Sequence, residues 1–164
     1  MSDSGAGRTN GNGSPAAVPE GFRAQVLTQY IKDLSFENPA APANLNGRPQ
    51  IELGFDLQAR RLAAEQFEVE MKLRVSAKAE EKSVFLLELV YAGLFQVQGA
   101  PEEILQPFLL IEAPHLLFPY ARRIVSDIIR DGGMPPLMIE PIDFAGLYRA
   151  NQAQAQQSPT TQAV

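Results

Sequence analysis

The segment at residues 84–97, with the sequence VFLLELVYAGLFQV, limits the possible folds more than any other part of the chain. A strand with one face in solvent alternates apolar and polar residues, whereas this segment is apolar at nearly every position of both faces. Its single charge is Glu88. In a chain of 164 residues we expect helices to cover one face of a sheet, and not both. The second apolar face therefore predicts a partner subunit or a functional surface.

Three segments before it also have strand patterns. Residues 25–37 and 51–57 alternate apolar and polar side chains, and residues 67–77 do so strictly. The short link at 79–82 suits a hairpin, whereas the loop at 38–49 is too long for a tight turn. Short links between consecutive strands favour an antiparallel sheet, because parallel pairs need a crossover connection. The sequence thus predicts four antiparallel strands.

Helical patterns follow the strands. Pro101 precedes two glutamates and suits the first turn of a helix. Pro114 is expected to disturb that helix, and a second helical segment is predicted at about 115–131. A glycine pair suits the end of that helix, and Asp143 can cap a last one. Strands first and helices last predict an α+β fold.

Both ends of the chain are expected to lie outside the folded domain. Residues 1–21 are rich in Gly, Ser, Asn, Ala and Pro, which predicts a disordered arm. Residues 150–164 carry no charged side chain and predict a flexible tail. One domain is therefore expected at 22–149. A secretory signal and an apolar run long enough to span a bilayer are both missing from the sequence, which favours a soluble cytoplasmic protein.

Composition argues against most catalytic and cofactor chemistry. A net charge of −5 disfavours nucleic acid and anionic membranes as partners, since both need a basic surface. The chain has no cysteine and one histidine, His115, so we predict no catalytic triad and no metal site. His115 is expected to be a surface or capping residue. Neither a P-loop motif nor a GxGxxG motif occurs, and we predict no cofactor.

The acidic residues of the predicted strands fall on one side of the sheet if the strands align. This set is Asp33, Glu37, Glu52, Asp56, Glu68, Glu70 and Glu88. The side is either an ordinary solvated surface or a docking surface for a basic partner, which gains fast and salt-sensitive association from such a field. Leu86 and Val90 flank Glu88 and favour the second interpretation, because a charge between apolar residues indicates apolar surface left exposed.

A second set of residues is apolar and lies outside the strands, in the long loop, the proline-rich segment and the last helix. It contains Leu45, Met134, Leu137, Met138, Ile139, Phe144, Leu147 and Tyr148. These side chains either form local core or line an adaptable apolar groove. The sequence pattern does not choose between the two.

Three segments resemble the SecB protein-export chaperone family. They are YIKDLSFENPAAP at 30–42, VFLLELVYAGLFQV at 84–97 and PHLLFPYARRIVSDIIRDGGMPPLMIEPIDFAGLY at 114–148. The resemblance implies a four-stranded antiparallel sheet with helices on one face, assembled as a homotetramer that is a dimer of dimers. It further implies an ATP-independent holdase that keeps unfolded preproteins competent for translocation and delivers them to the SecA motor.

Matching positions imply roles for individual residues. The SecA-docking residues are Asp33, Glu37, Leu86 and Glu88. The positions expected to affect assembly are Leu87, Leu89 and Tyr91, together with Tyr120, Ile124 and Ile128 on the long helix. The client groove is expected to include Leu53, Phe55 and Tyr148, with Leu45, Leu137, Ile139, Phe144 and Leu147.

Two other functions remain open from the sequence. The same groove could serve a dedicated chaperone of one toxin–antitoxin client, or a carrier of a small apolar ligand. An enzyme is the least expected class, because the chain offers no nucleophile–base pair.

Overall fold

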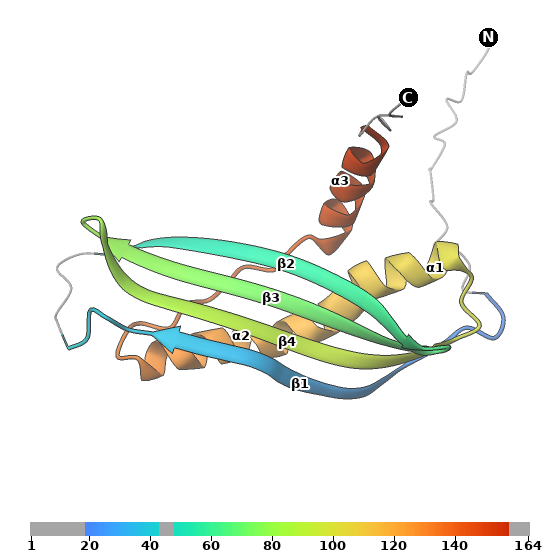
Figure 1. Cartoon of the computed structure of the whole chain (residues 1–164), viewed down its shortest axis with the longest axis horizontal. Coiled ribbons are helices and arrows are strands. Elements are labelled where there is room, and N and C mark those ends of the chain that lie inside the picture. The colour runs from blue at the N-terminus through green and yellow to red at the C-terminus, as the bar shows by residue number, and fades with distance from the viewer. Residues whose placement is uncertain (1–18, 43–47, 158–164) are drawn as a thin grey trace, which may run out of the picture.

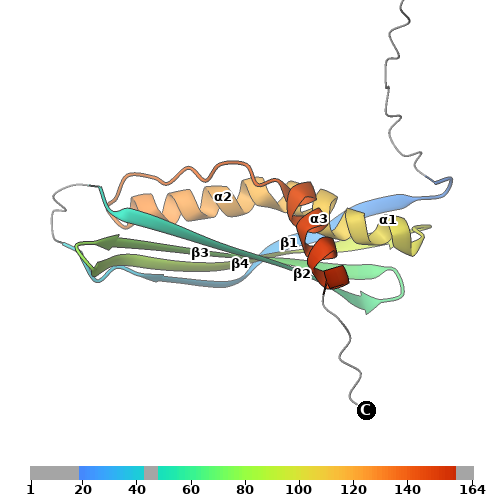
Figure 2. The same cartoon turned by 90° about the horizontal axis from the view of Figure 1, so that it is seen from above.

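A four-stranded antiparallel sheet forms one layer of the molecule and helices form the other (Figures 1 and 2). The computed structural model describes residues 19–42 and 48–157. The strands are β1 (Arg23–Glu37), β2 (Gln50–Ala63), β3 (Gln66–Ala79) and β4 (Lys82–Gln98). The helical segments are α1 (Glu102–Pro107), a π-helix η1 (Phe108–Glu112), α2 (Ala113–Asp131) and α3 (Phe144–Gln157). The predicted α+β fold with four antiparallel strands is confirmed.

The strand order is β1-β4-β3-β2, so β1 and β2 lie on opposite edges of the sheet. β2, β3 and β4 follow one another as hairpins, whereas the segment between β1 and β2 has to pass from one edge to the other. This crossing explains why the loop predicted at 38–49 exceeds a tight turn. β4 is an interior strand, because it pairs with β1 on one side and with β3 on the other.

β2 is longer than the sequence pattern indicated. It was expected to end at residue 57, but it continues to Ala63 because Arg60 and Arg61 pair across the sheet with residues of β3. This part of β2 is an exposed edge, so its side chains show no alternation of apolar and polar residues. Within the alternating part of β2, Phe55 and Leu57 pack partly against the core, whereas Ile51 and Leu53 are exposed.

The helical segments α1, η1 and α2 follow one another without interruption from Glu102 to Asp131 along one face of the sheet (Figure 2). The expected disturbance near Pro114 does occur, but it does not separate the helical segments. The chain instead widens to a π-turn just before Pro114, where the Ala113 N–H bonds to the Phe108 carbonyl. A proline ring would clash with the carbonyl four residues earlier in a regular helix, and a π-turn relieves that clash.

The core lies between α2 and the odd-numbered residues of β3 and β4. Its fully buried members include Leu73, Val75, Leu87, Leu89, Leu117, Val125 and Ile129. On the other face of β4, Leu86, Glu88, Val90 and Leu94 are only partly buried, whereas Val84 and Ala92 are buried. The two apolar faces of β4 thus have different environments, one beneath helices and one facing away from them. We call the second surface of the sheet the open face.

The last helix begins as predicted and ends later than predicted. The Gly146 N–H donates a hydrogen bond to Asp143 Oδ1 over 2.9 Å, so Asp143 supplies the expected cap. α3 then continues to Gln157, through residues placed in the flexible tail by the sequence analysis. It projects from the β2 side of the molecule (Figure 1). Among the described residues, no helix is long and apolar enough to cross a membrane.

Gly93 tests the packing of α2 on the sheet. A Cβ at this position would lie 2.8 Å from Leu117 Cδ2 and 2.8 Å from a ring carbon of Phe95. Both neighbours are fully buried. We expect Gly93→Ala to lower the free energy of unfolding by roughly 1–3 kcal/mol in urea denaturation, as overpacking does.

Gly54→Ala is the matched control, because a Cβ there meets its nearest atom at 3.6 Å, an ordinary contact. This variant should be neutral or slightly stabilising, since alanine reduces the entropy of the unfolded chain. Equal stabilities for the two variants would contradict the described contact between α2 and β4.

Candidate docking face and apolar groove

The open face brings together the four residues expected to dock SecA. Asp33 of β1 pairs with Val90 of β4, and Glu37 pairs with Leu86 in the same register. Glu88 lies between these two pairs, opposite Ser35. Paired residues of neighbouring strands point to the same side of a sheet. Asp33, Glu37, Leu86 and Glu88 therefore form one cluster at one end of the open face, which we call the docking cluster.

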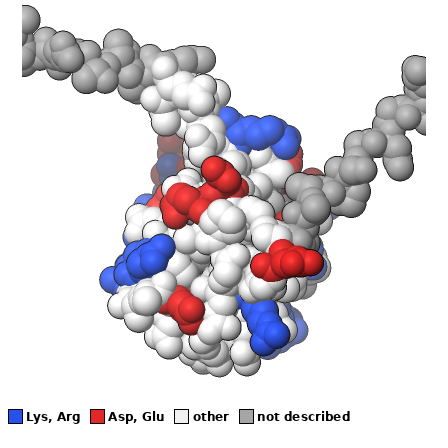
Figure 3. Space-filling model, turned by 90° about the vertical axis from the view of Figure 1, so that its right-hand side faces the viewer, with Lys and Arg blue, Asp and Glu red and all other residues white. Residues whose placement is uncertain are grey.

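The acidic residues identified in the sequence do share the open face, as their registers show. Basic residues share it too, because Arg74 is the register partner of Glu88 and forms an ion pair with it. Among the described residues, Asp33 and Glu37 have no ion-pair partner. At the α1 end of the molecule, side chains of both signs are likewise interspersed (Figure 3). The open face is thus only partly acidic, and Asp33 and Glu37 of the docking cluster are among its carboxylates without an ion pair within the described chain.

A cluster of charged groups occupies the other half of the open face. Glu68 of β3 is its centre and is only 3% exposed. The Tyr30 hydroxyl donates to Glu68 Oε1 over 2.5 Å, Lys32 Nζ lies 3.2 Å from both carboxylate oxygens, and Arg60 Nε donates to Oε2 over 2.6 Å. Lys32 also pairs with Glu70. Side chains from β1 and β2 therefore meet on β3 and tie the edges of the sheet together.

These contacts change the acidity of Glu68. Burial by itself raises the pKa of this carboxyl, but hydrogen bonds from Tyr30, Arg60 and Lys32 outweigh it and lower the pKa to about 2. Burial and the hydrogen bond to Glu68 raise the pKa of the Tyr30 hydroxyl. Glu68 is therefore ionised at neutral pH, and its charge is compensated by its neighbours.

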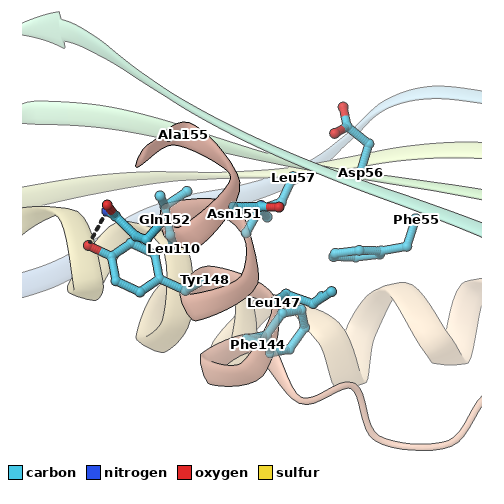
Figure 4. A pocket seen from close by; sticks show the side chains of 10 residues that line it. All are labelled: Phe55, Asp56, Leu57, Leu110, Phe144, Leu147, Tyr148, Asn151, Gln152 and Ala155. Atoms are coloured by element: carbon cyan, nitrogen blue, oxygen red, sulfur yellow. Dashed lines mark hydrogen bonds between the residues drawn. The ribbon is translucent and has the colours of Figure 1, made fainter. Parts of the chain in front are cut away.

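An apolar groove lies on the other side of the sheet, between β2, η1 and α3 (Figure 4). Its volume is about 400 Å³. Its lining residues are Phe55, Asp56, Leu57, Leu110, Phe144, Leu147, Tyr148, Asn151, Gln152 and Ala155. Phe55 packs on Phe144 with ring centroids 5.7 Å apart, and Gln152 Nε2 donates to the Tyr148 hydroxyl over 3.0 Å. The groove thus has an apolar floor and a polar rim on α3.

A second hollow of about 600 Å³ continues the groove along β2 toward α1. Leu57 and Leu110 line both hollows, so they join them. Leu105 and Leu109 add apolar surface to the second hollow, and Arg60 lies at its β2 side. Together the two hollows form a continuous trough along β2.

The structure places some of the predicted groove residues along this groove and others elsewhere. Phe55, Phe144, Leu147 and Tyr148 line the groove, and Phe144 is buried and contributes its floor. Leu53 is exposed on β2 next to the groove, and Leu137 is partly buried against the core; neither lines the groove. Ile139 is a correction, because it is buried in the core and lines neither hollow. Leu45 lies outside the described residues.

The residues expected to affect assembly fall into two groups. Leu87 and Leu89 are buried under α2 and cannot touch a partner subunit, which corrects their direct assignment to an interface. Tyr91 is nearly buried and stacks on Tyr120 at 6.4 Å between ring centroids. Half of Tyr120 is exposed on the outer side of α2, where Ile124 and Ile128 are partly buried. Leu87 and Leu89 can therefore affect assembly only indirectly, through the packing of α2.

Sequence reasoning missed the contribution of α3 beyond Tyr148. Asn151, Gln152 and Ala155 line the groove, but the segment has no large apolar residue and was assigned to the tail. Its richness in alanine and glutamine directly after the Asp143 cap was the usable signal, because alanine is the best helix former and glutamine is a good one.

His115 is exposed and its ring packs edge-on against Phe144 at 4.9 Å between centroids, in agreement with a surface position. No group of three or more His, Asp or Glu side chains in the described part of the chain could hold a metal ion. The described residues therefore form two candidate binding surfaces, the docking cluster and the apolar groove.

Comparison with known proteins points to one family. A family profile described as "Preprotein translocase subunit SecB" matches residues 19–155. A protein-export protein SecB of Caulobacter vibrioides is 48% identical over 151 residues, which cover 87% of this chain and 93% of the relative. A protein of the same name from Zymomonas mobilis is 52% identical over 141 residues, covering 85% and 86%.

A solved structure also resembles the fold. It is a SecB-like chaperone of Mycobacterium tuberculosis in complex with a peptide from an antitoxin. The TM-score is 0.62 at 22% identity, and the match covers 73% of this chain and 91% of the other. At this identity the likeness concerns the fold alone.

The Glu68 cluster generates a pH prediction. A lowered pKa stabilises the folded state above the unfolded value of 4.5, and this stabilisation is lost as the pH falls toward 2. The shift corresponds to about 3 kcal/mol at neutral pH. We therefore expect Glu68→Gln to lower the free energy of unfolding by that order at pH 7, and the difference from the unmodified protein to shrink between pH 5 and 2.

Urea denaturation at a series of pH values measures this difference. Glu103→Gln is the control, since it removes the same charge from an exposed position on α1 and should keep the full pH dependence. A difference between Glu68→Gln and the unmodified protein that stays constant from pH 7 to pH 2 would contradict the role given to the cluster.

Proposed function

The chain belongs to the SecB family of preprotein translocase subunits, and from this premise we propose that it is an ATP-independent holdase acting in the cytoplasm. It binds unfolded preproteins, keeps them competent for translocation and delivers them to the SecA motor. The observation that carries the proposal is the separation of two surfaces. The apolar groove lies between β2 and the helices, whereas the docking cluster lies on the opposite side of the sheet. Client and motor can therefore bind at the same time.

The groove holds clients by burying apolar side chains. Leu147 and Tyr148 are accessible to a client, and Leu53 extends the apolar surface along β2. Burial stabilises a complex by roughly 25 cal/mol for each Å² of apolar surface and has no directional preference. Such binding accepts varied sequences, as a chaperone of unfolded preproteins requires. Chemistry by a nucleophile or a metal has no part in this function, so the protein acts by binding and not as an enzyme.

We further propose a homotetramer built as a dimer of dimers. Leu116 and Tyr120 are about half exposed on the outer side of α2, and Ile124 and Ile128 lie on the same helix. β1 leaves one edge unpaired within the described chain and exposes Leu27 and Ile31. A long unpaired edge with apolar side chains is a liability unless another chain covers it. Several grooves in one assembly raise the avidity for a long client.

The relatives named for protein export favour this function over the alternatives. They share about half of their residues with this chain, whereas the antitoxin-binding neighbour shares 22%. A dedicated antitoxin chaperone is therefore the weaker hypothesis. A carrier of a small apolar ligand is weaker as well, because the trough formed by the two hollows is continuous along β2 and open to solvent.

The docking cluster generates the first functional prediction. Glu88→Lys reverses the charge at the centre of the cluster, so we expect the affinity for purified SecA to fall at least about tenfold in a titration by calorimetry. Client binding and the mass of the assembly should not change, because Glu88 faces away from the groove and from α2.

Glu103→Lys is the matched control, with the same change of charge at an exposed position on the helical side. It should leave the affinity for SecA unchanged. If Glu88→Lys binds SecA as tightly as the unmodified protein does, the docking cluster is assigned to the wrong face.

The groove generates the second functional prediction. Leu147→Ser removes an apolar side chain that is 43% exposed and lines the groove, so we expect the affinity for an unfolded preprotein to fall by roughly three- to tenfold. Fluorescence titration with an unfolded preprotein measures the change. Leu62→Ser is the control, because Leu62 is 51% exposed on β2 and lines neither hollow. Equal losses for both variants would argue against a defined groove.

A further inference from the structure

Arg74 of β3 forms an ion pair with one residue of the docking cluster. Arg74 and Glu88 are direct register partners on neighbouring strands, and Arg74 Nη1 donates a hydrogen bond to Glu88 Oε1. Within the described chain, Asp33 and Glu37 have no ion-pair partner, so Glu88 is the paired carboxylate of the cluster. The cation that compensates Glu88 belongs to the protein itself.

The pair is open to solvent. The side chain of Arg74 is 61% exposed and that of Glu88 is 44% exposed. Exposed ion pairs contribute little to stability, because water and salt solvate both partners when they separate. A cation from another protein can therefore replace Arg74 without a large loss of folding stability.

A hollow of about 430 Å³ lies directly beside the pair on the open face. Its charged lining groups are Asp33, Asp56, Lys72, Arg74 and Glu88, and Val90 contributes apolar surface. Three carboxylates and two cations therefore surround the space that a basic side chain of a partner would enter. Arg74 and Lys72 both repel such a side chain, but in the described structure only Arg74 of these two forms an ion pair with the docking cluster.

We propose that Arg74 attenuates docking by pairing with Glu88 in the free protein and by repelling the basic surface of the motor. The inference rests on the proposed function of the docking cluster and concerns its specificity. Before Glu88 meets a cation of the motor, it has to release Arg74. Arg74 thus sets both the affinity and the salt dependence of the complex and leaves the location of the docking cluster unchanged.

The direct test is Arg74→Gln, which frees Glu88 and removes one positive charge. We expect purified SecA to bind this variant of the full-length protein roughly three- to tenfold more tightly at about 50 mM salt, chiefly through faster association. This increase in affinity should become smaller at about 300 mM salt, because screening weakens both the Arg74–Glu88 pair and the repulsion between Arg74 and SecA. The melting temperature should change little, because the pair is exposed.

Two further variants separate the proposed mechanism from others. Arg23→Gln makes the same change of charge at the far end of β1, opposite Gln98, and should leave the affinity unchanged. The second is the double variant Arg74→Gln with Glu88→Gln. Removing Arg74 should raise the affinity for SecA less when residue 88 is Gln than when it is Glu, because no carboxylate then has to be released from Arg74.

Each outcome of these titrations decides the proposal. Unchanged or weaker binding of Arg74→Gln overturns it, and weaker binding would indicate that Arg74 positions Glu88 for the motor. An equal gain for Arg23→Gln also overturns it, because the effect would then reflect net charge. Glu88→Lys and the unmodified protein are titrated alongside. If the unmodified protein does not bind SecA, the proposed function fails as a whole, which differs from failure of the role of Arg74.

Discussion

The packing of α2 on the odd-numbered face of β4 is the contact on which the rest of the structure depends. β4 is apolar on both faces and lies in the interior of the sheet, so one helical layer buries only one of its surfaces. Leu87 and Leu89 are fully buried by that layer, whereas Leu86 and Val90 remain partly exposed. The apolar residues of the open face, where the docking cluster lies, therefore remain accessible to another protein.

On the open face, which no helix covers, side chains add a further link between the strands besides the backbone hydrogen bonds of the sheet. Glu68 provides it, because its carboxylate accepts hydrogen bonds from Tyr30 of β1 and Arg60 of β2. The side chains from β1 reach β3 across β4 where β4 carries the small residue Ala92. Removing one partner from such a buried charged group costs more than the pair itself contributes. The cluster thus ties the edges of the sheet together in the half of the open face away from the docking cluster.

The sequence predicted the fold well wherever side-chain periodicity reflected burial. β3 was found close to its true limits because its odd and even residues meet different environments, whereas β4 was found as a run that is apolar on both faces. Periodicity could not predict the end of β2, where an exposed edge strand has no core to pattern against, nor the uninterrupted helix through Pro114. Contacts between individual side chains on the same face of the sheet were harder still to predict. The pairing of Arg74 with Glu88 depends on the register of β3 and β4, which no property of either segment alone specifies.

The central claim is that the two sides of the sheet bind different partners, and methyl NMR spectra of the assembly test it directly. Unfolded preprotein should shift the methyl signals of Leu57 and Leu147 in the groove, and SecA should shift those of Leu86 and Val90 on the open face. With both partners present, both sets should be shifted together. Perturbation of Leu86 and Val90 by preprotein alone, or displacement of preprotein from the groove by SecA alone, would contradict the account.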